Sequence, residues 1–253
     1  MRVVFLGTGT SQGVPMIGCE CEVCCSDDRR DKRLRSSVYV ETSTVNIVID
    51  TSPDFRYQML RAGVKKIDGV LYTHDHKDHT GGMDDLRAYN YFMRKPIDVY
   101  CTAHVGAILR KDFDYAFADF RYPGVPEIDM HIIDEQPFMV GTLRVIPIRG
   151  KHFKQTVFGY RISDFCYLTD MNSIEDSEIE KFRGVDVLVI NALRHKEHMS
   201  HFTLEQALEV IAKAAPRRAF LTHISHQLGK YTDISPTLPS NVELAYDGLE
   251  LNF

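Results

Sequence analysis

Apolar residues occur along this chain in short runs that have the length of β-strands. The runs are rich in valine and isoleucine, and several show no alternation with polar residues. Uninterrupted apolar strands are typical of sheets that are covered on both faces. We therefore expect strands over residues 3–6, 38–42, 45–49, 70–72, 97–100, 143–148, 158–162, 165–168, 185–190, 219–221 and 242–246.

Helices are predicted between these strands from their end signals. Ser52 and Pro53 form a favourable N-cap and first-turn pair for a helix that ends near Gly63. Thr203 and Gln206 form a capping box ahead of an apolar helical face. Strands interleaved with helices, with no repeat and no linker rich in Pro, Gly or Ser, predict an α/β fold in which sheet packs between helices.

Composition narrows the class of protein. A chain of 253 residues, 44 % hydrophobic and 26 % charged, can bury a large core without disulfides, and we expect a single domain over residues 1–253. The net charge of −5 argues against a nucleic-acid partner bound through a basic face. No apolar run is long enough for a membrane span or a signal sequence. Six cysteines then indicate ligands or buried thiols, so we expect a cytoplasmic location.

The densest candidate chemistry follows the strand expected over residues 70–72. Three histidines and two acids occur within seven residues there, among them His74, His76, Asp78 and His79. Residues two apart point to one side of an extended backbone, so His74 and His76 can converge on one ion. Asp78 and His79 can then turn toward a second ion. Imidazole and carboxylate donors suit zinc, manganese or iron, and the spacing disfavours the alternative of a solvated polar loop.

This motif, H-x-H-x-D-H, resembles that of the metallo-β-lactamase superfamily. The family pattern also requires a distant histidine, an aspartate after a strand and a late histidine, and the chain supplies all three in order. The resemblance implies an αββα sandwich with two mixed sheets packed between outer helices, and two divalent ions, zinc or manganese. The ligands that it implies are His74, His76 and His152 for one ion, Asp78, His79 and His223 for the other, and Asp170 as the bridge.

A second cluster is built from sulfur. Four thiols occur within seven residues, and C-x-C-x-x-C can chelate one zinc ion that then needs a fourth ligand; ordinary buried or redox thiols are the alternative. Residues 11–15, 18–21 and 222–227 resemble the PhnP-type phosphodiesterases, which act on cyclic phosphodiesters. The resemblance implies a structural zinc ion on Cys19, Cys21, Cys24 and His226, with Cys25 as the alternative to Cys24.

The same resemblance implies a mechanism. Two metal ions would activate water to attack a small phosphodiester, of a cyclic sugar or a nucleotide, with Asp78 orienting the nucleophile. His201 precedes the capped helix, as does the equivalent histidine of PhnP-like and tRNA-processing enzymes, and is expected to be the general acid. His195 and His198 are expected to be solvated. Because the redox branch carries an acid at the position of His76, hydrolysis is favoured over electron transfer.

Several alternatives stay open. The acidic net charge and the lack of an inserted basic arm weaken the hypothesis of a nuclease of the tRNA 3′-processing kind. A thioester or lactam hydrolase would use the same metal core. A zinc-dependent scaffold with a silent site would not need the full ligand set.

Arg87 could bind a substrate phosphate or form an ion pair with Asp84, Asp85 or Asp50, and Asp50 is expected to orient the metal-binding loop. The resemblance also suggests a homodimer.

Overall fold

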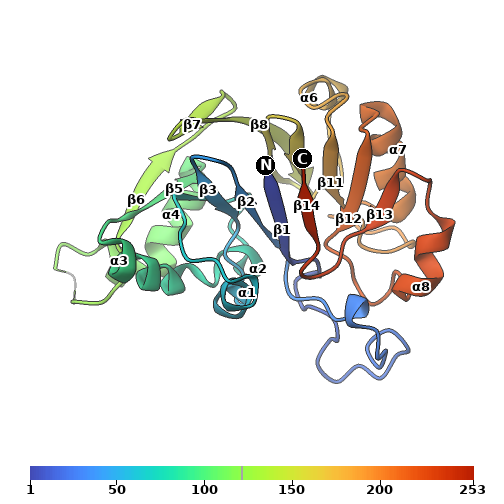
Figure 1. Cartoon of the computed structure of the whole chain (residues 1–253), viewed down its shortest axis with the longest axis horizontal. Helices are drawn as coiled ribbons and strands as arrows, with labels where there is room; N and C mark the ends of the chain where they lie inside the picture. The colour runs from blue at the N-terminus through green and yellow to red at the C-terminus, as the bar shows by residue number, and fades with distance from the viewer. Residues whose placement is uncertain (121) are drawn as a thin grey trace.

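Two seven-stranded sheets lie face to face at the centre of the molecule (Figure 1), in a computed structural model that describes residues 1–120 and 122–253. The first sheet has the order β14 (Glu250–Asn252), β1 (Arg2–Gly7), β2 (Ser37–Glu41), β3 (Asn46–Ile49), β4 (Gly69–Leu71), β5 (Ile97–Cys101) and β6 (Ile128–Ile132). The second has the order β13 (Val242–Leu244), β12 (Arg218–Thr222), β11 (Val187–Asn191), β10 (Phe165–Tyr167), β9 (Gln155–Ile162), β8 (Leu143–His152) and β7 (Phe138–Val140).

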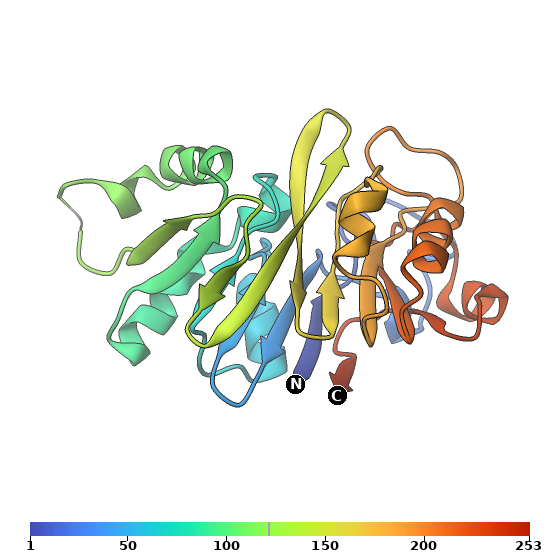
Figure 2. The ribbon, with the colours of Figure 1, turned by 90° about the horizontal axis from the view of Figure 1, so that it is seen from above.

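Both sheets are mixed, as expected. In the first sheet the pairs from β14 to β3 are antiparallel and those from β3 to β6 are parallel. In the second sheet the pairs from β13 to β10 are parallel and those from β10 to β7 are antiparallel. The chain therefore builds two sheets of similar plan, and β1 and β14 bring its two termini side by side in the first (Figure 2).

Helices cover the outer faces of the sandwich (Figure 2). Residues of α1 (Phe55–Ala62), α3 (Arg87–Met93), α4 (Ala103–Asp112) and α5 (Asp114–Phe117) pack on the first sheet. Residues of α6 (Asp176–Glu180), α7 (Leu204–Ala214) and α8 (Tyr231–Ile234) pack on the second. The remaining short helices are α2 (Lys77–Thr80) and three 3₁₀ turns, η1 (Arg29–Asp31), η2 (Met83–Leu86) and η3 (Ser235–Thr237). The predicted αββα sandwich is confirmed.

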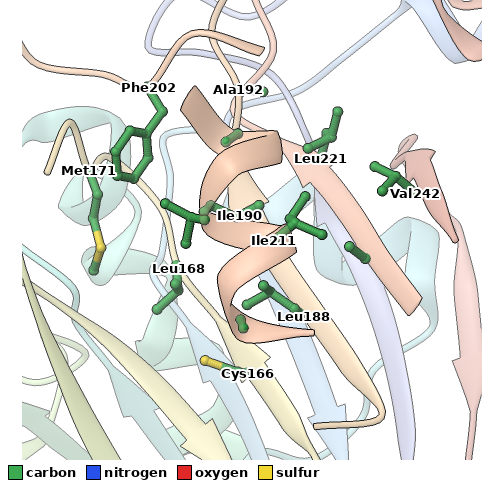
Figure 3. Close-up of a cluster of buried hydrophobic side chains, with 14 of the residues drawn as sticks. Cys166, Leu168, Met171, Leu188, Ile190, Ala192, Phe202, Ile211, Leu221 and Val242 are labelled. Carbon is green, nitrogen blue, oxygen red and sulfur yellow. The ribbon is translucent and has the colours of Figure 1, made fainter. Parts of the chain in front are cut away.

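The uninterrupted apolar strands arise because each strand is covered on both sides. Side chains alternate across a strand, so Val3 and Phe5 enter the core between the sheets while Val4 packs under the helices of the first sheet. The second sheet follows the same rule, and Figure 3 shows Ile211 of α7 packed over Ile190 of β11. Burying each such side chain contributes about 1.5–3 kcal/mol.

The differences from the sequence prediction fall at edges and ends. All eleven expected strands are present, but β6, β7 and β14 were missed, because edge strands need no continuous apolar run. The expected helix start at Ser52 and Pro53 is wrong: α1 begins at Phe55, after a turn in which the Ser52 hydroxyl accepts the N–H of Asp54 and donates to Gln58. The capping box of α7 and the end of α1 at Gly63 are confirmed. Within the described residues, each helix is too short or too polar to cross a membrane.

Candidate metal centre

A buried carboxylate organises the loop that follows β4. Asp50 lies directly after β3 in a left-handed conformation, with a φ of 64°, and is fully buried. It accepts the backbone N–H of Thr73 at 2.9 Å and the Thr73 hydroxyl at 2.8 Å, and its Oδ2 lies 2.7 Å from Nδ1 of His79. These are the contacts expected of a residue that orients a metal-binding loop. They engage Nδ1 of His79, so Nε2 is the ring nitrogen that can bind a metal ion.

Asp78 and His79 lie on α2, which is a single helical turn, and the ring of His79 lies 4.3 Å from that of His74. Their donor atoms meet those of Asp170, which follows β10, and His223, which follows β12; all four donors lie within 4.8 Å of one another. Nε2 of His79 is 3.2 Å from Asp78 and 3.1 Å from Asp170, and Nδ1 of His223 is 3.1 Å from Asp170. This group joins the ends of three different strands.

His74, His76 and His152 form the adjoining group. The ring centroids are 4.6 Å apart for His74 and His76, 4.9 Å for His76 and His152, and 5.5 Å for His74 and His152. Nδ1 of His152 donates to the carbonyl oxygen of Asp170 at 2.9 Å, which leaves Nε2 free. His152 lies on β8 itself, because this strand extends four residues beyond the predicted range.

Asp170 contributes to two donor groups of the centre. One of its oxygens contributes to the group with Asp78, and the residue also forms a group with His152 and His201 in which all donors lie within 4.8 Å. Oδ1 of Asp170 is 3.6 Å from Nδ1 of His201, and the ring of His201 is 4.7 Å from that of His152. His201 is thus closer to the potential ligands than its sequence position indicated.

Unpaired donors show that a cation fits this centre. Among the described residues, Nε2 of His74 and Nδ1 of His201 are buried ring nitrogens without a hydrogen-bond partner. Such atoms are costly to bury unless something binds them. Burial also lowers the pKa of His74, His152, His201 and His223, that of His201 to about 3, so these rings stay neutral and their lone pairs remain available. Neutral imidazoles beside carboxylates are suitable ligands for zinc, manganese or iron.

The cysteine cluster forms a separate donor group. Donors of Cys19, Cys21, Cys24 and His226 all lie within 4.8 Å, and Nδ1 of His226 is 3.3 Å from Sγ of Cys19 and 3.2 Å from Sγ of Cys21. Cys24 is buried in this group, whereas Cys25 is exposed and outside it. The backbone of Cys24 and the ring of His226 lower the pKa of Cys21 to about 6, which favours the metal-binding thiolate.

The cysteine loop lies beside the main centre. The backbone N–H of Ile224 donates to the carbonyl of Thr8, and the N–H of Thr10 donates back to the carbonyl of Ile224. The hydroxyl of Thr10 also lies 3.2 Å from Nε2 of His223. Figure 1 shows the N-terminal loop below the second sheet and near α8, where Asp31 accepts the N–H of Tyr231. A metal ion on the thiols would therefore stiffen the segment that supports His223.

Three other residues singled out in the sequence have different surroundings. Arg87 forms an exposed ion pair with Asp84 at 3.0 Å, which favours the structural alternative for this residue. His195 is exposed and pairs with Glu205, as expected of a solvated residue. His198 is only partly exposed, and its ring lies 5.1 Å from that of His201, so it is closer to the centre than expected.

Some residues that were not predicted from the sequence hold the metal-binding side chains in place without binding a metal ion themselves. Asn191 is fully buried at the end of β11, and its side chain bonds both the N–H and the carbonyl of Met171, each at 2.9 Å. These bonds fix the residue after Asp170. Ser36 lies 3.2 Å from Nδ1 of His223. The one available signal was a polar residue directly after the apolar run of residues 187–190.

Comparison with known proteins agrees with this geometry. A family model described as a β-lactamase superfamily domain matches residues 45–224. The chain belongs to the metallo-β-lactamase superfamily.

Its resemblance within the superfamily is to the PhnP family. A crystal structure of a diphosphatase from the PhnP family has a TM-score of 0.93 and 38 % sequence identity, covering 100 % of this chain and 97 % of the other. Zinc-bound PqqB from Methylobacterium extorquens has a TM-score of 0.77 at 21 % identity, over the full length of both chains, and shares the fold.

A curated relative is longer than this chain. The octanoyltransferase of Porphyromonas gingivalis is 42 % identical over 253 residues, which are 99 % of this chain but 51 % of that protein. The chain thus spans about half the length of this relative.

Proposed function

We propose that this protein is a phosphodiesterase that uses two divalent cations, zinc or manganese. The observation that carries the proposal is that Asp170 belongs to two adjoining donor groups. One cation would be held by His74, His76 and His152, the other by Asp78, His79 and His223, with Asp170 between them. When bound, such a pair lowers the pKa of water and stabilises charge on phosphoryl oxygens.

The side chains around the cations have separate tasks in this proposal. The carboxylate of Asp78 is part of the donor group and faces His79 at 3.2 Å, so it can orient the attacking water. His201 would protonate the leaving oxygen. Because burial lowers the pKa of His201 to about 3, the free protein holds this ring neutral, and the negative charge of a bound phosphodiester has to raise its pKa before it can donate.

A second candidate substrate has support from the comparisons. The PhnP-family protein of 38 % identity is described as a diphosphatase. A phosphorus atom in a diphosphate linkage and one in a phosphodiester both carry two bridging oxygens, so the same centre suits either substrate. We favour small phosphodiesters, including cyclic ones, and treat diphosphate linkages as the alternative that the experiment must separate.

The cysteine cluster completes the proposal. A zinc ion held by Cys19, Cys21, Cys24 and His226 would have a closed shell, which gives it a structural role. These thiols are free cysteines, which fits a reducing cytoplasm. A small phosphodiester as the binding partner and a homodimer as the assembly both stay predictions.

The test uses metal-free protein reconstituted with Mn²⁺ or Zn²⁺. We expect turnover of bis(p-nitrophenyl) phosphate that His76→Ala abolishes by removing a ligand. His201→Ala should also abolish it while keeping the metal content, and His195→Ala serves as the matched exposed control. Turnover of a dinucleotide diphosphate alone would favour the diphosphatase alternative. Turnover of neither, with metal bound, would refute phosphoester chemistry and favour a thioester substrate.

A further inference from the structure

A strained aromatic residue lies at the rim of the metal centre. Phe153 follows His152 directly and has a φ of 55°, a left-handed conformation that bulky side chains rarely adopt. Its side chain is 51 % exposed, so it is not part of the hydrophobic core. The positive φ belongs to the two-residue turn between β8 and β9, in which His152 and Gln155 are register partners. Glycine or asparagine would suit this turn better, so the choice of an exposed phenylalanine here needs another reason.

The surrounding contacts hold Phe153 in this conformation. Its backbone N–H donates to Oδ1 of Asn172 at 2.8 Å, and Nδ2 of the same amide donates to the carbonyl of Met199 at 3.1 Å. One side chain therefore joins the turn after His152 to the loop that carries His201. Met199 is itself 65 % exposed, so two large apolar side chains stand open on neighbouring segments beside the centre.

A cation lies beside the Phe153 ring. Nζ of Lys154 lies 5.3 Å from the centre of the Phe153 ring. The ring of His198, on the same loop as Met199, lies 5.1 Å from that of His201. An apolar surface with a cation beside it suits a flat, aromatic group that is joined to an anion.

We propose that Phe153 and Met199 form a platform that binds an aromatic group of the substrate, such as a nucleobase, while its phosphate lies at the metal centre. This inference rests on the proposed function for the position of the phosphate. The platform is on the side of His201, so the aromatic group would belong to the part of the substrate that leaves. An exposed ring in a strained turn gains free energy only when a ligand covers it.

The experiment compares two ligands that differ only in the base. Adenosine 5′-monophosphate and ribose 5-phosphate are titrated calorimetrically into the zinc-loaded protein. We expect the nucleotide to bind at least about tenfold more tightly, which corresponds to about 1.4 kcal/mol and lies within the range for one base stacked on an aromatic ring. Phe153→Ala should remove this preference, Phe153→Tyr should keep it, and Met199→Ala should reduce it.

Two further variants separate binding from folding. Phe92→Ala removes an aromatic side chain that is 79 % exposed on α3, away from the metal centre, and should leave the preference unchanged. Phe153→Gly relieves the left-handed backbone and should lose the preference without loss of thermal stability. Equal binding of both ligands to the wild type, or a preference that survives Phe153→Ala, would overturn the platform.

Failure of the platform and failure of the proposed function give different results. Turnover of bis(p-nitrophenyl) phosphate without a base preference would refute the platform alone. A base preference that depends on Phe153, in a protein that cleaves no phosphoester, would support the platform and refute the proposed function.

Discussion

Two tyrosines on adjacent strands offer a controlled test of how the sheet supports the metal-binding loop. Tyr160 of β9 and Tyr167 of β10 are register partners, and both are fully buried. The hydroxyl of Tyr160 donates to the carbonyl of Tyr72 at 2.6 Å, two residues before His74. The hydroxyl of Tyr167 has no hydrogen-bond partner among the described residues. The same change, Tyr→Phe, should therefore have opposite effects at the two positions.

The magnitudes follow from these contacts. Tyr160→Phe removes a buried hydrogen bond and leaves the carbonyl of Tyr72 without that donor, so we expect a loss of about 1–3 kcal/mol in the free energy of unfolding. Tyr167→Phe removes a buried polar group that is unpaired, so we expect a gain of about 1 kcal/mol. For a chain of this size each kcal/mol shifts the melting temperature by about 2–4 °C.

The assay is equilibrium unfolding in urea at a fixed zinc concentration, with the midpoint and the slope compared among the wild type and the two variants. A change in midpoint with a constant slope would report stability alone. Zinc affinity should also fall in Tyr160→Phe, because the bonded carbonyl immediately precedes Thr73 and His74. Equal losses of stability in both variants would refute the argument from unpaired groups.

Four further changes test the centre and its supports. Asp50→Asn should weaken metal binding about 10–100-fold, measured by competition with a chelator, because the amide no longer accepts all three bonds. Cys24→Ser should remove one zinc equivalent by elemental analysis while Cys25→Ser keeps it, and equal contents would contradict the assignment of Cys24. In metal-free protein, the rate of alkylation of Cys21 should rise with pH through about 6 and then level off, because the lowered pKa of this thiol gives a full thiolate above that value. Mass spectrometry after pulse labelling measures this rate, and a midpoint near 8.5, the pKa of an ordinary cysteine, would contradict the expectation. Thr203→Ala should lower stability by about 0.5–2 kcal/mol in a thermal melt, since it removes the capping box of α7, and no change would contradict a role for this cap.

The sequence predicted those parts of the fold that depend on local pattern. Inner strands such as β3 and β11 are covered on both faces, so their apolar runs are unbroken and visible in the sequence. Edge strands such as β6 carry half-exposed side chains and give no such run. The start of α1 was misplaced because Ser52 begins a turn ahead of the helix, bonding the N–H of Asp54, and a capping pattern does not distinguish such a turn from the first turn of a helix.

The candidate centre was predictable for a different reason. Metal donors belong to few residue types, and H-x-H-x-D-H concentrates them in one segment. The spacing C-x-C-x-x-C already favoured Cys24 over Cys25, and the structure places Cys24 in the donor group while Cys25 is exposed outside it. The position of His201 among the donors required the structure, since the loop before α7 brings this ring against His152.

Backbone conformation carries information about the centre that the motif lacks. Asp50, Asp170 and His223 follow three different strands, and all have a positive φ, of 64°, 57° and 54°. For residues with a side chain this conformation costs about 1–2 kcal/mol each. The neighbouring backbone is bonded in place: the N–H of Asp50 donates to the carbonyl of Leu71, and that of Ile224 donates to Thr8.

Glycine would relieve the strain at each of these positions but would supply no donor or acceptor. A positive φ alone does not mark a functional residue, because Arg94 and Ala215 have a similar φ where α3 and α7 end. What sets Asp50, Asp170 and His223 apart is that each also contributes to the donor groups or orients them. Phe153, with a φ of 55°, lies in the two-residue turn between β8 and β9, and it has no donor atom in its side chain. The platform proposed for Phe153 would use this ring, and the comparison of ligands with and without a base would measure its contribution.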